Sequence, residues 1–340
     1  MTVVEGLDLA AVQKFFDAEV PEIRGPLRAE LIHGGRSNLT YRLTDGYSTW
    51  VLRRPPLGGL TPSAHDMARE YRVVAGLAGT SVPVARAVAL GQDLSILGMQ
   101  FSVFEYVAGR VIRTKDDLHA LSDAEIIGCA YGLIDVLAEL HAVDFEAIGL
   151  GDFGRPKGYL ARQIRRWHDQ WNRVHTRALP DVETLYSRLA EICPAESAAS
   201  IVHGDYRIDN AIFDAADVGR VRALVDWEMA TLGDPLADLG LHLVYSDPAL
   251  DFMVGGSAAS TSERLPSTAE LAQHYAIASG RDLGNLAFYR GLGYFKAAVI
   301  AEGIHARYTS GLTLGLGFET TGQAVPLFAA AGLNAIAGNR

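Results

Sequence analysis

The residues with the clearest chemical meaning are Asp205 and Asn210, five positions apart in the stretch His203 to Asn210. This is the spacing of phosphoryl-transfer loops, in which the Asp aligns a substrate hydroxyl and takes its proton, and the Asn binds Mg²⁺. Sixteen residues after Asn210, the strand-like run Val221 to Val225 ends in a second carboxylate, Asp226. A ligand for a metal–phosphate complex belongs at such a strand end. Two motifs in this order, at a spacing that fits one β-hairpin, predict phosphoryl-transfer chemistry.

Each of these residues also has an ordinary structural interpretation. Asp205 could be a solvated loop acid, Asn210 could close an Asx turn, and Asp226 could cap a helix. Their joint placement favours the catalytic interpretation. Arg207, two residues after Asp205, could neutralise charge on a transferring phosphate. It could equally form a surface salt bridge with Asp209, and the sequence leaves both interpretations open.

Three residues around the loop are interpreted as structural. His203, two residues before the catalytic Asp, can brace the loop backbone. Asp238 is expected to support the loop from outside. Asp234, which precedes a proline, is typical of a turn or a helix cap.

Composition sets the broad class of the protein. The chain has 340 residues, of which 49% are hydrophobic, so it can bury a sizeable core in about two domains or lobes. A net charge of −10 argues against a general nucleic-acid-binding protein. Cys129 and Cys193 lack metal-ligand spacing and are interpreted as reduced thiols. We see no basic and apolar leader and no apolar run of the roughly 18–20 residues that span a bilayer. We therefore expect a cytoplasmic protein that does not associate with membranes.

Hydrophobic periodicity divides the chain near residue 105. Strands are expected at 31–43, 49–53, 85–90 and 99–106, with helices at 9–16 and 65–77. Beyond that point helical patterns dominate, at 123–141, 159–175, 182–192, 268–279, 286–308 and 322–337. The exceptions are a hairpin-like segment, 201–225, and a Gly/Ser-rich segment, 253–267, which is interpreted as a mobile loop. We expect an α+β protein with a small β-sheet N-lobe, residues 1–105, and a larger, mostly helical C-lobe, residues 106–340.

Several segments resemble the aminoglycoside phosphotransferase family, within the protein-kinase-like two-lobed fold. They are Gly34 to Asn38, Val51 to Pro56, Arg69 to Tyr71, His203 to Asn210 and Gly233 to Gly240. The resemblance covers most of the chain and is closest to the branch whose domains also occur fused to acyl-CoA dehydrogenases. It implies a nucleotide-binding antiparallel sheet in the N-lobe, a catalytic loop and acceptor site in the C-lobe, and ATP and Mg²⁺ as cofactors. Within it, Asn210 and Asp226 are the expected Mg²⁺ ligands.

The same resemblance assigns Arg53 the place of the strand lysine that contacts the ATP phosphates. Strand alternation places Val51 and Arg53 on one face and Arg54 on the other, which favours Arg53. Arginine departs from the family pattern, because it offers a planar fork instead of a point charge. Glu70, on the predicted helix 65–77, is the expected ion-pair partner of Arg53. Its alternative is a solvated helix face.

Two further segments are expected to contact the nucleotide. The segment Gly34 to Asn38 lies between two strands, where backbone amides, the Ser37 hydroxyl and Asn38 could cover the phosphates. A glycine pair by itself would only predict a hairpin turn. After the last predicted strand, the Glu105 carbonyl and the Val107 amide are expected to bind the adenine edge. The alternative is an edge strand that simply ends there.

A basic segment from Arg155 to Arg177 indicates the kind of acceptor that the protein binds. The segment also carries Trp167 and Trp171 on one helical face. A basic wall favours an anionic acceptor, such as a hydroxyacyl-CoA, over a polycationic aminoglycoside. The alternative is a solvated basic helix with its tryptophans in the core. Two other functions stay open: an aminoglycoside antibiotic kinase, and a catalytically inactive nucleotide-binding module that regulates a partner. The inactive module stays open because Arg53 stands where the family pattern has a lysine.

Overall fold

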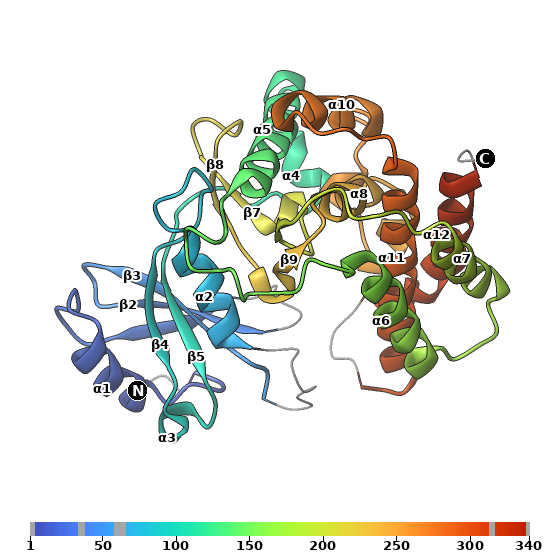
Figure 1. The fold of residues 1–340 in the computed structure, drawn as a ribbon. Helices are drawn as coiled ribbons and strands as arrows, with labels where there is room; N and C mark the ends of the chain where they lie inside the picture. The colour runs from blue at the N-terminus through green and yellow to red at the C-terminus, as the bar shows by residue number, and fades with distance from the viewer. Residues whose placement is uncertain (1–3, 33–37, 58–65, 313–316, 338–340) are drawn as a thin grey trace. The chain divides into compact units, whose positions relative to one another are not determined.

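The computed structural model of the chain describes residues 4–32, 38–57, 66–312 and 317–337. It divides into two compact units (Figure 1). Unit 1 comprises Met1–Ala108 and Ala223–Ala230, and unit 2 comprises Gly109–Arg222 and Thr231–Arg340. The short segment Ala223–Ala230 therefore belongs with the N-terminal part of the chain, although it follows the predicted catalytic loop, residues 203–210, in sequence.

Unit 1 is built on a five-stranded antiparallel sheet with the strand order β1-β2-β3-β5-β4. The strands are β1 (Arg28–Leu31), β2 (Leu39–Thr44), β3 (Thr49–Arg54), β4 (Ala87–Gly91) and β5 (Phe101–Glu105). A tight turn joins β2 to β3: the Asp45 carboxylate accepts from the amides of Tyr47 and Ser48, and Gly46 has a positive φ of 93°. Only glycine adopts that conformation without strain, so the turn and the register of the hairpin are encoded locally.

The faces of the unit 1 sheet follow from strand alternation. Trp50 and Leu52 of β3 enter a buried core with Phe16 of α1 (Leu9–Glu19), and the Phe16 and Trp50 rings meet edge to face at 5.3 Å. Arg53 lies on the other face of the strand. Helix α2 (Met67–Leu77) begins at its N-cap Asp66, whose side chain accepts from the Arg69 amide. A short helix, α3 (Leu94–Leu97), precedes β5.

Unit 2 is mostly helical. Its helices are α4 (Lys115–His119), α5 (Asp123–Ala142), α6 (Tyr159–Val174), α7 (Pro180–Glu191), α8 (Pro235–Val244), α9 (Ala249–Val254), α10 (Thr268–Ser279), α11 (Leu286–Thr309) and α12 (Thr321–Ala337). Helix α11 packs against α12, α8, α6 and α7. It comes close to α8 at Gly240, where a Cβ atom would lie 2.6 Å from the Tyr289 carbonyl carbon. Glycine at this crossing thus permits the close packing of the two helices.

Short strands flank the predicted catalytic loop, residues 203–210. Strand β6 (Ser200–Val202) pairs antiparallel with β9 (Thr231–Gly233), and β7 (Ala211–Phe213) pairs with β8 (Val221–Leu224). The loop runs from the end of β6 to the start of β7 and ends in the 3-10 turn Ile208–Asn210. Both ends of the loop are therefore fixed by backbone pairing.

The segment 253–267 differs from the mobile loop expected from its composition. It holds the end of α9 and a 3-10 turn, Ala259–Thr261. The Asp251 carboxylate organises it by accepting from the Ala258 amide and the Thr261 hydroxyl, both at 2.8 Å, and from Lys115 at 2.9 Å. Such contacts leave no periodic signal in the sequence. Within the described residues, no helix combines the length and the apolar character needed to cross a membrane.

Candidate active site

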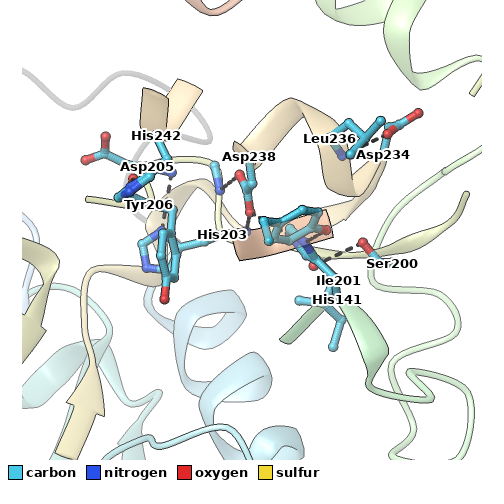
Figure 2. A network of polar contacts seen from close by, with 12 residues as sticks. His141, Ser200, Ile201, His203, Asp205, Tyr206, Asp234, Leu236, Asp238 and His242 are labelled. Carbon is cyan, nitrogen blue, oxygen red and sulfur yellow. Dashed lines mark hydrogen bonds and ion pairs between the residues drawn. The ribbon is translucent and has the colours of Figure 1, made fainter. Parts of the chain in front are cut away.

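The backbone of the catalytic loop is held by one buried carboxylate. Asp238, on α8, accepts from the amides of His203 at 2.5 Å and Gly204 at 2.8 Å (Figure 2). The His203 ring is buried as well, and its Nδ1 accepts from the Asp205 amide at 3.3 Å. The structural roles predicted for His203 and Asp238 are confirmed, as is the N-cap role of Asp234, which accepts from the Leu236 amide.

The charge of Asp238 is maintained despite its burial. Burial by itself would raise the pKa of Asp238, but its interaction with the neighbouring His141 ring and the hydrogen bond from the Gly204 amide lower this pKa below its ordinary value. His141 Nε2 lies 3.5 Å from the Asp238 carboxylate, while its Nδ1 lies 2.7 Å from the Tyr275 hydroxyl. An ionised carboxylate that accepts two amides fixes the loop more firmly than a neutral acceptor would.

Both oxygens of the predicted catalytic carboxylate, Asp205, are held in place. The Tyr245 hydroxyl, at the end of α8, donates to Asp205 Oδ1, and Asn210 Nδ2 donates to Asp205 Oδ2 at 3.0 Å. Asn210 Nδ2 also donates to the Asp205 carbonyl at 2.9 Å, so the 3-10 turn brings the two residues together. Burial would raise the pKa of Asp205, but Arg207, the Tyr245 hydrogen bond and Lys296 lower it. The carboxylate is therefore ionised and oriented.

The side chain of Asn210 presents a carbonyl oxygen that can bind a hard cation. Because its amide nitrogen faces Asp205, its carbonyl oxygen is the atom left for another partner. Oxygen donors of this kind suit Mg²⁺, which takes few ligands from protein and the rest from phosphate and water.

Arg207 forms the salt bridge that the sequence left open. Its Nη2 contacts the Asp209 carboxylate, and its guanidinium lies 5.4 Å from the centroid of the Tyr245 ring. Burial would lower the pKa of Arg207, but the charges of Asp209 and Asp205 raise it above its ordinary value. Its Nε is buried without a hydrogen-bond partner in the described part of the chain. The residue is a permanent cation with a spare donor.

In unit 1, Arg53 is held between two carboxylates. Its Nη1 contacts Glu70, which is only 2% exposed, and its Nη2 lies 2.8 Å from Asp226 Oδ1. Burial would lower the pKa of Arg53, but Glu70 and Asp226 raise it above its ordinary value. Its Nε is buried and has no partner among the described residues. Arg54 faces the opposite side of the strand, where it contacts the carbonyls of Gly6 and Pro55.

Asp226 has a strained backbone. Its φ of 68° is the one positive φ of a non-glycine residue within the described ranges. A left-handed conformation costs an L-residue roughly 1–2 kcal/mol, and strain of this kind concentrates at functional sites. The Asp226 side chain caps no helix, because it accepts no amide of the following 3-10 turn. One of its carboxylate oxygens accepts a hydrogen bond from Arg53. The other oxygen is a ligand atom of the kind that Mg²⁺ prefers.

The other residues that are predicted to contact the nucleotide also belong to unit 1. Asn38 Nδ2 donates to Glu228 Oε2 at 3.1 Å. Ser37, with the glycines that precede it, lies outside the described residues. The Glu105 amide donates to the Arg86 carbonyl at 2.9 Å, whereas the Val107 amide has no acceptor in the described structure.

The side chains of the basic segment from Arg155 to Arg177, in unit 2, have different surroundings. Arg162 turns back to the carbonyls of Arg155 and Lys157, and Arg177 pairs with the buried Glu302 at 3.2 Å. Trp171 is a core residue whose Nε1 donates to Glu183 at 2.7 Å. Trp167 is half-buried and lies under the Lys296 ammonium, which is 5.3 Å from its ring centroid. Arg162 and Arg177 thus have structural partners, as does Arg173, which donates to Gln170 at 3.1 Å, and Trp171 belongs to the core.

Sequence reasoning missed Tyr245 and Lys296, which contact the catalytic loop from α8 and α11. Lys296 Nζ donates to the Gly204 carbonyl. A signal for Lys296 exists, since it is a single lysine in the apolar helical run Gly291–Val299 and lysine is rarely buried without a reason. Tyr245 ends an apolar helix and leaves no comparable signal.

This fold and this loop define a phosphotransferase of the protein-kinase-like class. The family model described as the phosphotransferase enzyme family matches residues 28–289, and the chain belongs to this family. The predicted family and the predicted α+β, protein-kinase-like fold are thereby confirmed.

Individual relatives agree with this assignment. The chain is 34% identical to acyl-CoA dehydrogenase family member 11 of Homo sapiens over 281 residues, which are 82% of this chain and 36% of that protein. It therefore spans about a third of the length of this curated relative. A crystal structure from Ralstonia eutropha, proposed to be an aminoglycoside phosphotransferase, is 34% identical, with a TM-score of 0.81 over 96% of this chain and 98% of that one. An aminoglycoside phosphotransferase in ternary complex with AMP-PNP and hygromycin B shares the fold at 16% identity, with a TM-score of 0.61 over 96% of this chain and 99% of that one.

Proposed function

We propose that this protein is an ATP-dependent kinase that transfers the γ-phosphate to a hydroxyl of a small anionic molecule, such as a hydroxyacyl-CoA. The observation that carries the proposal is the state of Asp205. Its carboxylate is ionised, oriented by Tyr245 and Asn210, and set in a loop whose amides bind Asp238. Phosphoryl transfer depends more on such positioning of the reacting groups than on covalent chemistry by the protein.

In the proposed reaction the acceptor hydroxyl binds Asp205. The acceptor oxygen forms a bond to the γ-phosphorus as the bond from that phosphorus to the bridging oxygen of ADP breaks. The hydroxyl proton passes to Asp205, and ADP leaves with the electron pair of the broken bond. A carboxylate of lowered pKa is a weak base, which suits a loose transition state in which the proton moves late. Arg207 would neutralise charge on the transferring group.

The nucleotide would be bound by groups of unit 1. The unpaired Nε of Arg53 is a buried donor suited to a phosphate oxygen, and the ion pair with Glu70 keeps its side chain extended. Asn38 and Ser37 would contact the phosphates. The Val107 amide, which lacks an acceptor in the described structure, and the Glu105 carbonyl would bind the adenine edge. The AMP-PNP complex of a protein with the same fold supports ATP as the nucleotide.

Mg²⁺ would be held by the Asn210 carbonyl oxygen and the Asp226 carboxylate. When bound, it would neutralise phosphate charge and help to orient the leaving group. The strained backbone of Asp226 supports this role, because the conformation aims a carboxylate that makes no cap.

Two observations support an anionic acceptor: the positive charge on helix α6, and the proteins in which similar domains occur. Arg165 and Arg166 of α6 are exposed, and neither has an ion-pair partner among the described residues. Positive groups beside an acceptor site favour an anion and disfavour a polycationic aminoglycoside. Similar domains are part of proteins named for acyl-CoA dehydrogenases, so a functional link to acyl-CoA chemistry fits.

The test is a screen of ATP consumption by the purified protein against hydroxyacyl-CoAs, aminoglycosides and simple amino alcohols, with mass spectrometry of the product. We expect a phosphorylated hydroxyacyl-CoA. Asp205→Ala should lower the rate by about a thousandfold or more, whereas Asp217→Ala, in an exposed turn after β7, should not. Turnover of aminoglycosides alone, or a wild-type rate for Asp205→Ala, would overturn the proposal.

A further inference from the structure

Lys296 is a cation that makes few direct contacts with other groups of the protein. It lies on α11 between the buried residues Phe295 and Ala297, and it is itself half-buried. Its ammonium donates to the Gly204 carbonyl and lies over the Trp167 ring, and the described residues provide no further partner. An ammonium group has additional N–H donors that one carbonyl cannot satisfy. A partly desolvated charge with unused donors is costly unless water or a ligand supplies the missing acceptor.

A second cation, Arg166, adds to this local positive charge. Burial and the nearby charge of Arg166 lower the pKa of Lys296, whereas Asp205 and Asp238 act in the opposite direction. Arg166 is exposed and makes no ion pair with the described residues. It directly precedes Trp167 on α6. Two cations close enough to repel each other gain stability when an anion binds between them.

The nearby carboxylates are already engaged by other groups. Asp238 accepts the two amides of the loop and faces His141. Asp205 binds Tyr245 and Asn210 through its two oxygens. Within the described part of the chain, neither carboxylate forms a hydrogen bond or an ion pair with Lys296. The cluster of Lys296, Arg166 and Trp167 therefore offers two positive groups and an aromatic face beside the catalytic loop.

We propose that Lys296, Arg166 and Trp167 form a subsite that binds an acidic or carbonyl oxygen of the acceptor, next to the hydroxyl that Asp205 aligns. This inference rests on the proposed kinase function. Lys296 contacts Gly204, which directly precedes Asp205, so the oxygen it recognises belongs to the reacting end of the acceptor. The acceptor class is thus a hydroxy acid or its thioester, with the hydroxyl a few carbons from the carbonyl. The distant phosphates of CoA would bind elsewhere.

Trp167 gives a binding readout that does not need turnover. Of the four tryptophans, Trp50, Trp171 and Trp227 are no more than 2% exposed, whereas Trp167 is half-buried under Lys296. Titration with 3-hydroxybutyryl-CoA, under selective tryptophan excitation, should therefore change the emission of Trp167. Trp167→Phe should lose most of the signal. Lys296→Met should weaken the binding by about tenfold or more, because a charge-assisted hydrogen bond is lost.

Arg166→Met should weaken the same binding by about threefold to tenfold, as expected for an exposed charge. Because Arg166 is exposed, this variant should fold even if Lys296→Met does not. The matched control is Arg188→Met, an exposed arginine on α7, which should bind like the wild type. Equal binding by the wild type, Lys296→Met and Arg166→Met would overturn the subsite.

Kinetics separates the subsite from a purely structural role of Lys296. For a subsite, Lys296→Met raises KM for the hydroxyacyl-CoA by more than it lowers kcat, and it leaves KM for ATP unchanged. A fall in kcat with an unchanged KM for the hydroxyacyl-CoA would mean that Lys296 only braces Gly204, and it would overturn the proposal. If no hydroxyl is phosphorylated but Lys296-dependent binding persists, the kinase function fails and the subsite stands. If transfer proceeds and neither variant changes KM, the function stands and the subsite fails.

Discussion

Replacing Asp238 with asparagine should both destabilise the protein and slow phosphoryl transfer. The carboxylate accepts from the amides of His203 and Gly204 at 2.5 and 2.8 Å and is 1% exposed. Asparagine keeps the shape of the side chain but replaces one oxygen with an NH₂ group. That group would face a backbone N–H, so one buried amide of the catalytic loop would lose its acceptor.

The size of the effect follows from these contacts. A buried amide left without an acceptor costs about 1–3 kcal/mol, and the remaining bond loses its charge-assisted part, about 1 kcal/mol. Asp238→Asn should therefore lower the free energy of unfolding by about 2–4 kcal/mol at neutral pH. The pKa of Asp238 is lowered in the folded protein, so the charge stabilises the fold at neutral pH. That contribution declines as the pH falls below the unfolded value of about 4 and then through the lower folded value, and the two proteins should converge in acid.

The matched control is Asp234→Asn. Asp234 is also fully buried and accepts from the Ser197 amide at 2.6 Å, the Ser197 hydroxyl at 2.7 Å and the Tyr289 hydroxyl at 2.9 Å. Among the described residues, it forms no hydrogen bond with the catalytic loop. Urea unfolding should show comparable losses for the two variants. At a temperature where both are folded, Asp238→Asn should lower kcat by about a hundredfold through misplacement of the loop. Asp234→Asn should leave kcat within a few-fold.

Two results would refute this reasoning. A loss of less than about 1 kcal/mol for Asp238→Asn would mean that the amides find other acceptors or water. Equal changes of kcat in the two variants would mean that burial of charge, and not support of the loop, connects this residue to activity.

Three further predictions address other parts of the site. Tyr245→Phe should lower kcat by about tenfold with a change in Tm of only a few degrees, because Asp205 loses the hydrogen bond that orients Oδ1; an unchanged kcat would contradict this. Asp226→Gly and Asp226→Ala should both be inactive, but in urea unfolding the glycine variant should be more stable by about 1 kcal/mol, since glycine relieves the strain at φ 68°; equal stabilities would show that the strain is absent. Burial lowers the pKa of His242 to about 4. As the pH falls from about 6.5, the His242 ring therefore takes up a proton in the unfolded state before it does so in the folded state. The free energy of unfolding should decline towards pH 4 by at most about 3 kcal/mol. His242→Gln should flatten this decline in urea unfolding at a series of pH values, and an unchanged slope would assign it to other groups.

The parts of the site that the sequence determined depend on short-range geometry. Asp205 and Asn210 meet because one 3-10 turn joins residues five apart, and that spacing is visible in the sequence. Alternation along β3 separates Arg53 from Arg54 for the same reason, since neighbouring residues of a strand face opposite sides. Periodicity likewise predicted the sheet in the first part of the chain and the long helices in the second. Roles such as nucleotide and Mg²⁺ binding remain predictions.

Only the tertiary structure decided which distant side chains complete the site. Lys296 reaches Gly204 across 92 positions, and Tyr245 reaches Asp205 across 40, so neither pair has a spacing that local rules describe. The left-handed backbone of Asp226 and the membership of residues 223–230 in unit 1 depend equally on long-range packing. The physical reason is that such contacts are selected by the folded core, in which helices far apart in the chain lie side by side. The sequence by itself thus predicted the chemistry of the loop, and the fold decided which side chains orient Asp205 and which cation contacts the loop.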